Sequence, residues 1–368
     1  MRRAGAALAL LVTAAVSLTA CGTAATRADD TAVTTGVEQV PLSALTPLAD
    51  PRAFEGPSTA VLADAAIVPS IDDATQQLPT TVMSRDATGD TPVTISDTSR
   101  VIAMDLSGSL AATVWGLGFG DSLVGRDVST TFPGTEDLPV ITSGGHTINA
   151  EAIIGLAPTL VITDGSIGPR DVVEQLRDVG ITVVFVENEA SFDGAAQLAR
   201  DVGAVFGASA AGDLLAEQVI VEVKATRAEI DELAPADGER LRMVFLYLRG
   251  SAGVYYLFGE ESGADDLIDG LDGVDVAGEL GWSGMQPLTD EAMVAANPDL
   301  ILVMTSGLES VGGVDELLES KPAIALTNAG QHRRFVDMAD GQILSFGPRS
   351  ALVLDALARA VYAPADRS

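Results

Sequence analysis

Short apolar runs alternate with stretches of helical periodicity from about residue 100 onward. Residues 100–105 and 159–163 are apolar runs with the length of strands that are buried on both faces of a sheet. Other stretches carry apolar residues three and four positions apart and end at a glycine, which is typical of amphipathic helices. In this half of the chain we expect helices at 109–117, 171–179 and 192–206, and strands at 122–125, 138–141 and 181–186. Strands that alternate with helices predict a parallel α/β sheet.

One long stretch, residues 209–233, separates this pattern from a second one of the same kind. It is rich in helix formers, has no glycine after Gly212 and is followed by Pro235. Beyond it we expect strands at 241–248, 299–304, 337–338 and 342–344, and helices at 264–270, 314–320 and 347–362. The chain is therefore predicted to form two α/β lobes with central sheets joined by one long rigid helix, with the first lobe at 100–207, the connecting helix at 208–236 and the second lobe at 237–368.

A repeat within the sequence supports two lobes of similar build. Glu151 begins a stretch that reads Glu-Ala-Ile-Ile-Gly-Leu-Ala-Pro-Thr-Leu, and Glu291 begins one that reads Glu-Ala-Met-Val-Ala-Ala-Asn-Pro-Asp-Leu. Glutamate, alanine, proline and leucine recur at the same spacing in both stretches. Each stretch predicts a short helix, a break before the proline and a buried strand.

The charge of the chain restricts its partners. The 368 residues include 52 acidic and 21 basic side chains, which gives a formal net charge of −31. Such a charge repels the phosphates of nucleic acids, so we expect neither DNA nor RNA as a partner. The simplest explanation of the acidity is solubility in an extracellular or salt-rich setting.

The first residues have the pattern of an exported lipoprotein. Arg2 and Arg3 precede an apolar stretch at 4–16, which is too short to span a membrane comfortably. Small residues then lead to Cys21, the only cysteine of the chain. This pattern resembles a bacterial lipobox, which implies removal of a signal peptide at 1–20 and lipidation of Cys21, so that lipid anchors the protein to the extracellular face of the cell membrane. The alternative is an ordinary secretory signal followed by an accidental cysteine.

Residues 21–99 are rich in threonine, alanine, aspartate and proline. Their beginning is typical of a flexible tether that holds a folded domain away from a membrane. Segments 59–68 and 92–95 have strand or helix character, which leaves open that part of this N-terminal extension packs on the first lobe.

Histidine occurs only twice in the chain. His146 lies in a glycine-rich turn directly before the first copy of the repeat, and His332 lies in a basic polar segment. We interpret His332 as a surface residue. His146 is either a turn histidine with local hydrogen bonds or a ligand at the mouth of the first lobe.

Tyr247 and Arg249 lie at the carboxyl end of the predicted strand 241–248, where open α/β sheets place their ligands. Side chains two positions apart on a strand point to the same side. An arginine next to a phenol favours the phenolate, and tyrosinate can hold haem iron as an axial ligand. His146 and Tyr247 would then hold a flat iron cofactor between the lobes. The alternative is a surface strand end on which Arg249 stacks.

Other kinds of site have less support in the residues. Zinc and manganese carriers use several histidine and carboxylate ligands, whereas this chain has two histidines. No nucleophile elbow occurs, and the Gly-Phe-Gly-Asp sequence at 118–121 does not match a phosphate-binding loop. We therefore expect that the protein is not an enzyme.

Several of these segments resemble a known protein family. The chain resembles the ABC-transporter substrate-binding proteins of the cobalamin, siderophore and haem class at residues 100–105, 125–127, 149–162 and 289–302. Within that class, Gly145 and His146 together with Tyr247 and Arg249 resemble the haem-carrier lipoproteins of actinobacterial uptake systems (HmuT type). The resemblance extends from about residue 100 to the C-terminus.

The resemblance implies a carrier that captures ferric haem between its two lobes for iron uptake. It implies His146 and Tyr247 as axial ligands of the iron, with Arg249 supporting the tyrosinate. Trp282 and Met304 match positions that would line the pocket. The residues do not single out a partner for the haem propionates.

The resemblance also implies delivery to the dimeric permease of an ABC transporter with its ATPase. Glu151 and Glu291, one on each lobe, would dock onto arginines of the permease dimer. We expect the carrier itself to be a monomer. Arg126, Arg170 and Arg349 are candidates for the propionate contacts.

Three alternatives remain open at this point. On the same scaffold, a ferric siderophore or cobalamin as ligand would make Tyr247 an aromatic wall and His146 incidental. A haem enzyme such as a peroxidase needs an open iron position, which a second protein ligand would occupy. A cell-wall lipoprotein without a small ligand would not account for the repeat between the lobes.

Overall fold

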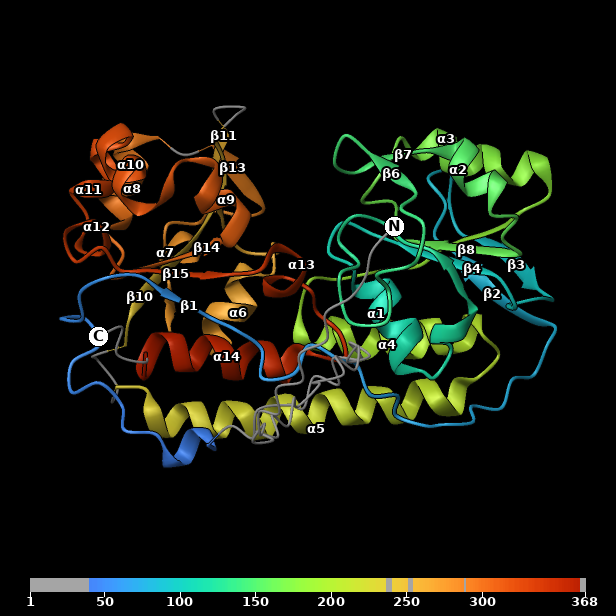
Figure 1. Ribbon diagram of the computed structural model, residues 1–368, viewed down its shortest axis with the longest axis horizontal. Helices are drawn as coiled ribbons and strands as arrows, with labels where there is room; N and C mark the ends of the chain where they lie inside the picture. Colours follow the sequence, from blue (N-terminus) through green and yellow to red (C-terminus); the bar gives the residue numbers. More distant parts are fainter. Residues whose placement is uncertain (1–39, 236–239, 251–253, 288, 365–368) are drawn as a thin grey trace, which may run out of the picture. The chain divides into compact units, whose positions relative to one another are not determined.

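The computed structural model describes residues 40–235, 240–250, 254–287 and 289–364. They belong to one compact unit in which two α/β lobes are joined by the long helix α5 (Ser209–Leu233), as Figure 1 shows. The two-lobed α/β class predicted from the sequence is confirmed. The predicted signal peptide 1–20 and lipidation site Cys21 lie outside the described residues. Among the helices that are described, none combines the length and the apolar character needed to cross a membrane.

The first lobe is built on a parallel sheet with the strand order β5-β4-β8-β9. Its elements are β4 (Val101–Met104), α1 (Ser109–Gly116), η2 (Gly120–Ser122), β5 (Leu123–Gly125), α2 (Ala150–Gly155), β8 (Leu160–Thr163), α3 (Arg170–Gln175), η3 (Leu176–Val179), β9 (Thr182–Phe185) and α4 (Phe192–Val205). Every residue of β4 and β8 is buried, which explains why both strands are continuous apolar runs rather than alternating ones. Because these strands are parallel and in register, their carboxyl ends lie at the same edge of the sheet.

One strand expected in this lobe does not form. In place of a strand at 138–141, Val140 alone makes an isolated bridge, to Arg126. Pro139 has no N–H group to donate to a strand ladder, which limits pairing at this point. The chain then enters a short hairpin of β6 (Thr142–Ser143) and β7 (Thr147–Ile148).

The second lobe has a mixed sheet with the order β1-β15-β14-β10-β11-β13, in which β12 also pairs with β10. Its strands are β1 (Ser58–Thr59), β10 (Arg242–Arg249), β11 (Val254–Phe258), β12 (Val274–Asp275), β13 (Met285–Pro287), β14 (Leu300–Met304) and β15 (Phe335–Met338). Its helices are α6 (Ala264–Gly270), α7 (Val276–Glu279), α8 (Asp290–Ala296), α9 (Thr305–Ser310), α10 (Gly313–Ser320), α11 (Pro322–Ala325), α12 (Asn328–Gln331), α13 (Asp340–Ile343) and α14 (Ser350–Tyr362). The strand β10 is parallel to β14 and antiparallel to β11.

The strand predicted at 342–344 is a correction in this lobe. These residues belong to the end of helix α13 and the residue that follows it. Three residues are too few for a period of two to be told from a helical one. The helix packs closely on the first lobe, because a Cβ added at Gly341 would lie 2.7 Å from the carbonyl oxygen of Ser129.

The connecting helix α5 buries one stripe of side chains. Leu215, Val219 and Val223 recur four positions apart and are all buried. The stripe packs against α4 of the first lobe and α14 of the second, and Figure 1 shows α5 running alongside both helices. The crossing with α4 is tight, since a Cβ at Gly203 would lie 2.7 Å from the Cα atom of Gly212. The same helix therefore belongs to the core of both lobes.

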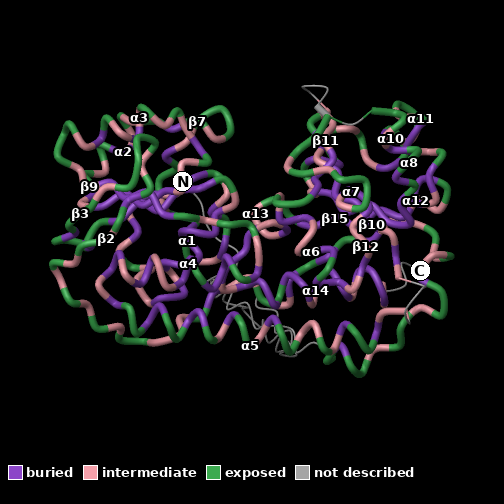
Figure 2. The backbone as a smooth tube through the Cα atoms, turned by 180° about the vertical axis from the view of Figure 1, so that it is seen from behind, coloured by how far each residue is buried: buried purple, intermediate pink, exposed green. Residues whose placement is uncertain are grey.

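Residues 40–99 pack on both lobes rather than on the first alone. Strand β1 adds an edge to the sheet of the second lobe by pairing in parallel with β15. Strands β2 (Thr80–Ser84) and β3 (Thr91–Ile95) form a hairpin against the first lobe. Leu42, in the short helix η1 (Leu42–Ala44), and Ile95 are completely or almost completely buried. Figure 2 shows buried positions in the strands of both lobes and along the inner side of α5.

A buried arginine attaches this extension to the second lobe. The side chain of Arg334 has no exposed surface and donates hydrogen bonds to Ser58 Oγ at 2.8 Å and to the carbonyl oxygen of Val361 at 2.7 Å. Its guanidinium also lies over the ring of Phe54, 4.6 Å from the centroid. Burial lowers the pKa of Arg334 to about 10, which leaves the group charged at neutral pH.

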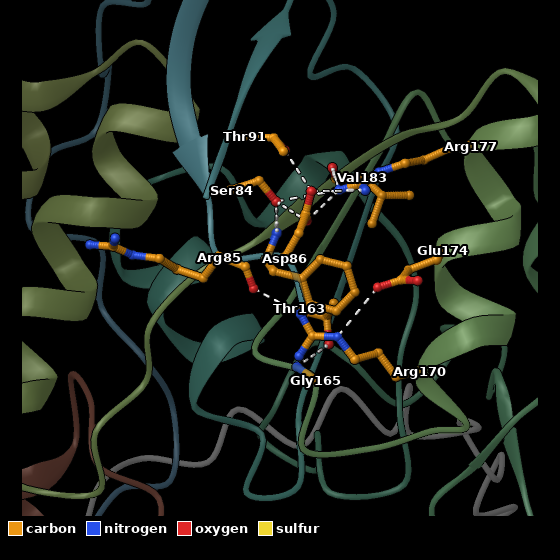
Figure 3. A network of polar contacts seen from close by, with 11 residues as sticks. Ser84, Arg85, Asp86, Thr91, Thr163, Gly165, Arg170, Glu174, Arg177 and Val183 are labelled. Carbon is orange, nitrogen blue, oxygen red and sulfur yellow. Dashed lines mark hydrogen bonds and ion pairs between the residues drawn. The ribbon is translucent and has the colours of Figure 1, made fainter. Parts of the chain in front are cut away.

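A second arginine attaches the extension to the first lobe (Figure 3). Arg177 donates to both carboxylate oxygens of Asp86, at 2.8 and 3.1 Å. Burial opposes the charge of Asp86, but hydrogen bonds from Arg177, Thr91 and Ser84 outweigh it and lower the pKa of Asp86 to about 2. The hairpin of β2 and β3 is thus fixed by a charged pair that persists across the physiological pH range.

Candidate functional site

His146 lies at a turn that requires glycine. Gly144 and Gly145, in the hairpin of β6 and β7, have φ angles of 55° and 94°. A Cβ added at either glycine would meet no atom within 4 Å, so the space beside the turn is open. The backbone N–H of Ile148 donates to the carbonyl oxygen of Gly168 at 2.9 Å and ties the hairpin to the loop after β8. The imidazole is therefore carried on a fixed turn next to free space.

The Nδ1 atom of His146 is buried and has no hydrogen-bond partner among the residues that the structure describes. Leaving a buried polar atom without a partner costs about 1–3 kcal/mol. Burial lowers the pKa of His146, the positive charge of Arg249 lowers it further, and the negative charge of Asp105 opposes both. The neutral imidazole is thus favoured, which is the form that ligates a metal. Local hydrogen bonding through Nδ1, the simpler explanation of this histidine, is not observed.

Aspartates follow three parallel strands of the first lobe, and the sequence prediction missed them as a set. Asp105 and Asp164 come directly after β4 and β8, and Asp127 comes two residues after the end of β5. Asp105 and Asp127 have no exposed surface. The signal was present in the sequence, because the segments Val-Ile-Ala-Met-Asp, Leu-Val-Gly-Arg-Asp and Leu-Val-Ile-Thr-Asp share an aspartate at the carboxyl end of an apolar run. Such strand ends converge at the ligand-binding edge of open α/β sheets.

Asp105 caps helix α1. Its Oδ1 accepts a hydrogen bond from the backbone N–H of Leu110 at 3.1 Å, and its Oδ2 accepts from the N–H of Ser109 at 3.1 Å and from the hydroxyl of Ser107 at 2.8 Å. The position before the helix is held by Gly108, with a φ of 77°. A carboxylate from the preceding strand therefore satisfies the helix N-terminus.

Asp127 links the neighbouring loop to Asp105. Its Oδ2 accepts a hydrogen bond from the backbone N–H of Asp105 at 3.1 Å, and its Oδ1 accepts from the N–H groups of Ser129 and Thr130, both at 2.8 Å. Burial, together with the negative charge of Asp105, raises the pKa of Asp127 to about 7. The same two causes raise the pKa of Asp164. Buried carboxylates thus hold this edge of the first lobe together.

Tyr247 and Arg249 form the corresponding edge of the second lobe, at the end of β10. The ring of Tyr247 stacks on Phe258 with a centroid distance of 5.8 Å and an interplanar angle of 21°. The guanidinium of Arg249 lies over the ring of Tyr247, 6.0 Å from its centroid. Arg249 is exposed, and its charge reaches His146 of the first lobe. Arg249 thus stacks on Tyr247, as expected for a surface strand end. Its positive charge also lowers the pKa of His146.

The structure brings Met304 beside Tyr247 but places Trp282 elsewhere. Leu246 pairs with Val303 in the parallel ladder, so the residues that follow them, Tyr247 and Met304, are neighbours at the strand ends. Both are half-buried against the same core cluster. Trp282 packs against the other cluster, which contains Leu246 and covers the opposite face of the sheet. Met304 therefore shares a face with Tyr247, and Trp282 does not.

Three arginines considered for the acidic groups of a ligand are engaged within the protein. Arg126 donates to the carbonyl oxygen of Thr130 at 3.1 Å. Arg170 lies over the ring of Phe185 at 4.1 Å and is tied to neighbouring backbone and carboxylate oxygens (Figure 3). Arg349 is buried, with 4% of its surface exposed. Arg249 is instead the exposed arginine whose charge reaches His146.

Glu151 and Glu291 occupy matching positions in the two lobes. Each is exposed in the first turn of a short helix, α2 or α8. The helices are capped alike, because the side chains of Asn149 and Thr289 each accept a hydrogen bond from the backbone N–H three residues later, at 3.1 and 3.2 Å. Figure 1 shows both helices on the side of their lobes that lies away from α5.

The match between the two helices continues into their apolar residues. Ile153 and Met293 are completely buried and anchor the helices to their lobes. The next residues, Ile154 and Val294, are 44% and 48% exposed. Each helix therefore presents a glutamate and, one turn later, an aliphatic side chain to solvent.

A cavity of about 960 Å³ lies away from all of these groups. It is lined mainly by the second lobe, and its walls include the acidic side chains Glu189, Glu260, Glu261, Asp265, Asp266 and Asp275. So many carboxylates repel a ligand that itself carries acidic groups.

Comparison with known proteins gives results that agree with this geometry. The profile of a family described as periplasmic binding protein matches residues 105–340. A crystal structure of the heme binding protein HmuT is 42% identical with a TM-score of 0.80, and the match covers 85% of this chain and 99% of that one. Further matching structures are HmuT variants in which alanine replaces a histidine, a tyrosine or an arginine, the last two being two positions apart.

Two curated proteins are more distant. The uncharacterized ABC transporter substrate-binding lipoprotein YvrC of Bacillus subtilis is 28% identical over 284 residues, which are 74% of this chain and 86% of that protein. The cobalamin-binding protein of Halobacterium salinarum is 28% identical over 214 residues, which are 57% of this chain and 55% of that protein.

Proposed function

The chain belongs to the periplasmic binding protein family, and on this premise we propose that it captures ferric haem outside the cell and delivers it to an ABC permease for iron uptake. The proposal rests on the Nδ1 atom of His146, which is buried and has no hydrogen-bond partner within the described part of the chain. The positive charge of Arg249, on the other lobe, lowers the pKa of this histidine after burial has done so. A ligand bound between the strand edges of the two lobes would give this nitrogen atom a partner. Arg249 stands two residues after Tyr247, whose phenol oxygen is a fitting ligand for ferric iron.

The similarity to HmuT supports both the cargo and the residues. HmuT is named as a heme binding protein, and the variants studied by crystallography replace a histidine, a tyrosine and an arginine in it. Tyrosine and arginine two positions apart correspond in spacing to Tyr247 and Arg249. We assign His146 and Tyr247 as the axial ligands of the iron, and Arg249 as the cation that favours the tyrosinate.

The remaining pocket residues are assigned by their place on the sheet. Met304 supplies an apolar, polarisable contact next to Tyr247 on the same face. Trp282 packs against the cluster on the opposite face, and its contact with the ligand stays a prediction. A carrier role needs no catalytic group, and two protein ligands on the iron would leave no open position for peroxide or oxygen chemistry. We therefore propose a carrier without enzymatic activity.

Docking to the permease is proposed for α2 and α8. Their exposed Glu151 and Glu291 suit basic groups on a dimeric partner, one on each half. Ile154 and Val294, one turn further along, add an apolar contact to each charge. Matching surfaces on the two lobes fit a partner that is itself two-fold symmetric. Lipidation at Cys21 would keep the carrier at the extracellular face of the membrane beside that partner.

An absorption titration of the full chain in detergent with hemin tests the proposal. We expect a Soret band that sharpens, saturates at one haem per protein and changes shape in both His146→Ala and Tyr247→Ala. A parallel titration with cobalamin distinguishes the alternative ligand on the same scaffold. Saturable cobalamin binding without a spectral response to hemin would exclude haem as the cargo, and with it the two iron ligands.

A further inference from the structure

Two aliphatic side chains are exposed at the strand edge of the first lobe, directly next to its buried aspartates. Leu106 follows Asp105 and is 50% exposed, and Val128 follows Asp127 and is 42% exposed. Single exposed apolar residues are common on protein surfaces and mean little by themselves. These two differ because the structure holds them together and next to the proposed haem site.

Hydrogen bonds join the two loops that carry the exposed residues. The hydroxyl of Ser129, the residue after Val128, donates to the carbonyl oxygen of Leu106 at 2.6 Å. On the preceding residues, the N–H of Asp105 donates to the carboxylate of Asp127 at 3.1 Å. The loops after β4 and β5 are therefore connected on both sides of the exposed side chains. We call Leu106 and Val128 the apolar ledge.

The same loop supports the apolar ledge and the turn of His146. Ser166, in the loop after β8, accepts a hydrogen bond from the N–H of Leu106 at 2.9 Å. Two residues further on, Gly168 accepts from the N–H of Ile148 in the His146 hairpin at 2.9 Å. The charge of Asp105, next to Leu106, is also one of those that reach His146. The ledge thus lies near the imidazole on one continuous support.

The buried aspartates make the ledge rigid before any ligand arrives. Asp105 accepts hydrogen bonds from Ser107, Ser109 and Leu110, which fixes the loop that carries Leu106. Ordering a loop or side chain on binding opposes association, so a surface that is ordered beforehand binds more tightly for the same contact. A fixed apolar surface next to a metal-ligating group suits a flat ligand with an apolar ring and a central metal.

We propose that the apolar ledge of Leu106 and Val128 is the surface of the first lobe on which the tetrapyrrole ring packs, independently of the bond between iron and protein. This assignment rests on the proposed function and adds residues that select for the ring. A ferric siderophore presents polar chelating groups around its metal and would gain little from the ledge. The ring of a porphyrin would cover both side chains and remove them from water.

Metal-free protoporphyrin separates ring contact from iron ligation. The affinities of the full chain in detergent for hemin and for protoporphyrin IX are measured for wild type, for Leu106→Ala combined with Val128→Ala, and for His146→Ala. We expect the double variant to bind both ligands roughly tenfold more weakly, because about five methylene-sized groups lose partial burial. His146→Ala should weaken hemin binding and leave protoporphyrin binding as in wild type.

Val179→Ala is the matched control, since Val179 is an exposed aliphatic residue of the same lobe (58%) outside the ledge. It should bind both ligands as wild type does, and all variants should keep the wild-type melting temperature because the truncated side chains are half-exposed. Unchanged affinities in the double variant would overturn the ledge while leaving the haem proposal intact. Loss of hemin binding alone would also overturn it, because the residues would then act through the iron. Failure of wild type to bind hemin would overturn the proposed function and the ledge together.

Discussion

The two lobes contain the same helix–proline–strand unit but differ at the strand edges that follow it. In the first lobe the strands lead into aspartates, among them the buried Asp105 and the half-buried Asp164. In the second lobe β14 ends in Met304, and the neighbouring β10 carries Tyr247 and Arg249 among its last three residues. The helices α2 and α8, by contrast, keep their caps and their exposed glutamates in both lobes.

This difference separates two tasks within one repeated scaffold. A two-fold symmetric partner requires equal surfaces, and the outward helices are equal. The strand edges, by contrast, are unlike, with an imidazole on one side and a phenol with an arginine on the other. If the proposed function holds, the repeat corresponds to the docking side and the departures from the repeat to the ligand side.

The largest effect is expected from changes in the matching helices α2 and α8. Replacing Glu151 and Glu291 together by alanine should abolish haem uptake by cells, because both proposed charge contacts with the permease are lost. Each single variant should retain part of the uptake, and to a similar extent if the lobes dock alike. Uptake of labelled haem and hemin affinity are measured side by side. A loss of hemin affinity in the double variant would assign these glutamates to the ligand site instead.

The attachment of residues 40–99 should also differ between the lobes. Arg334→Ala leaves the buried oxygens around Ser58 without donors and is expected to lower the free energy of unfolding by about 3 kcal/mol. Arg177→Ala removes a partly exposed partner of Asp86 and should cost about 1 kcal/mol. Urea unfolding of the two variants checks the ranking. Equal costs would mean that the extension is held no more firmly by the second lobe than by the first.

Because the two strand edges differ, replacing the two proposed iron ligands should lower haem affinity to different extents. Tyr247→Ala should weaken ferric haem binding on the order of 100-fold, and His146→Ala on the order of tenfold, because an anionic oxygen ligand favours ferric iron more than a neutral nitrogen does. Reduction of the iron to the ferrous state should narrow the difference between the affinity losses of the two variants. Equal losses, or a larger loss for His146→Ala in the ferric state, would contradict this ranking.

The buried aspartates predict a pH dependence of stability. The folded-state pKa of Asp127, about 7, lies above the ordinary value of 3.8, so the folded protein keeps a proton that the unfolded chain releases between these values. Its contribution to stability is present below about pH 4 and is lost as the pH rises toward 7, so from pH 5 to pH 8 it should lower the free energy of unfolding by about 3 kcal/mol.

Asp127→Asn cannot titrate and should remove this part of the pH dependence in urea unfolding. Asp275 of the second lobe provides the comparison, because burial raises its pKa to about 6 while hydrogen bonds from Gly278 and Ala277 oppose the rise. Asp275→Asn should therefore alter the pH dependence over a narrower range. A wild-type slope retained in Asp127→Asn would show that this carboxyl group is not the one that titrates.

Much of the architecture followed from local patterns in the sequence. Continuous apolar runs identified β4 and β8 because both faces of these strands are covered, and the glycine-poor stretch identified α5 because a long helix needs no more than helix formers and one apolar stripe. The candidate groups His146 and Tyr247 were visible because rare or paired residues stood at turns and strand ends.

Other features depended on contacts between distant segments. The pairing of β1 with β15 joins residues far apart in the chain, and the helix α13 in place of a strand at 342–344 is too short for periodicity to reveal. Trp282 could be assigned to a face of the sheet only once the packing around it was known. The sequence by itself determined the lobes, the connecting helix and the chemical types at the strand ends, since these follow from local hydrophobic periodicity and residue chemistry. The tertiary structure decided which of those groups meet, because burial, charge and free hydrogen-bonding capacity arise only when the strand edges are packed together.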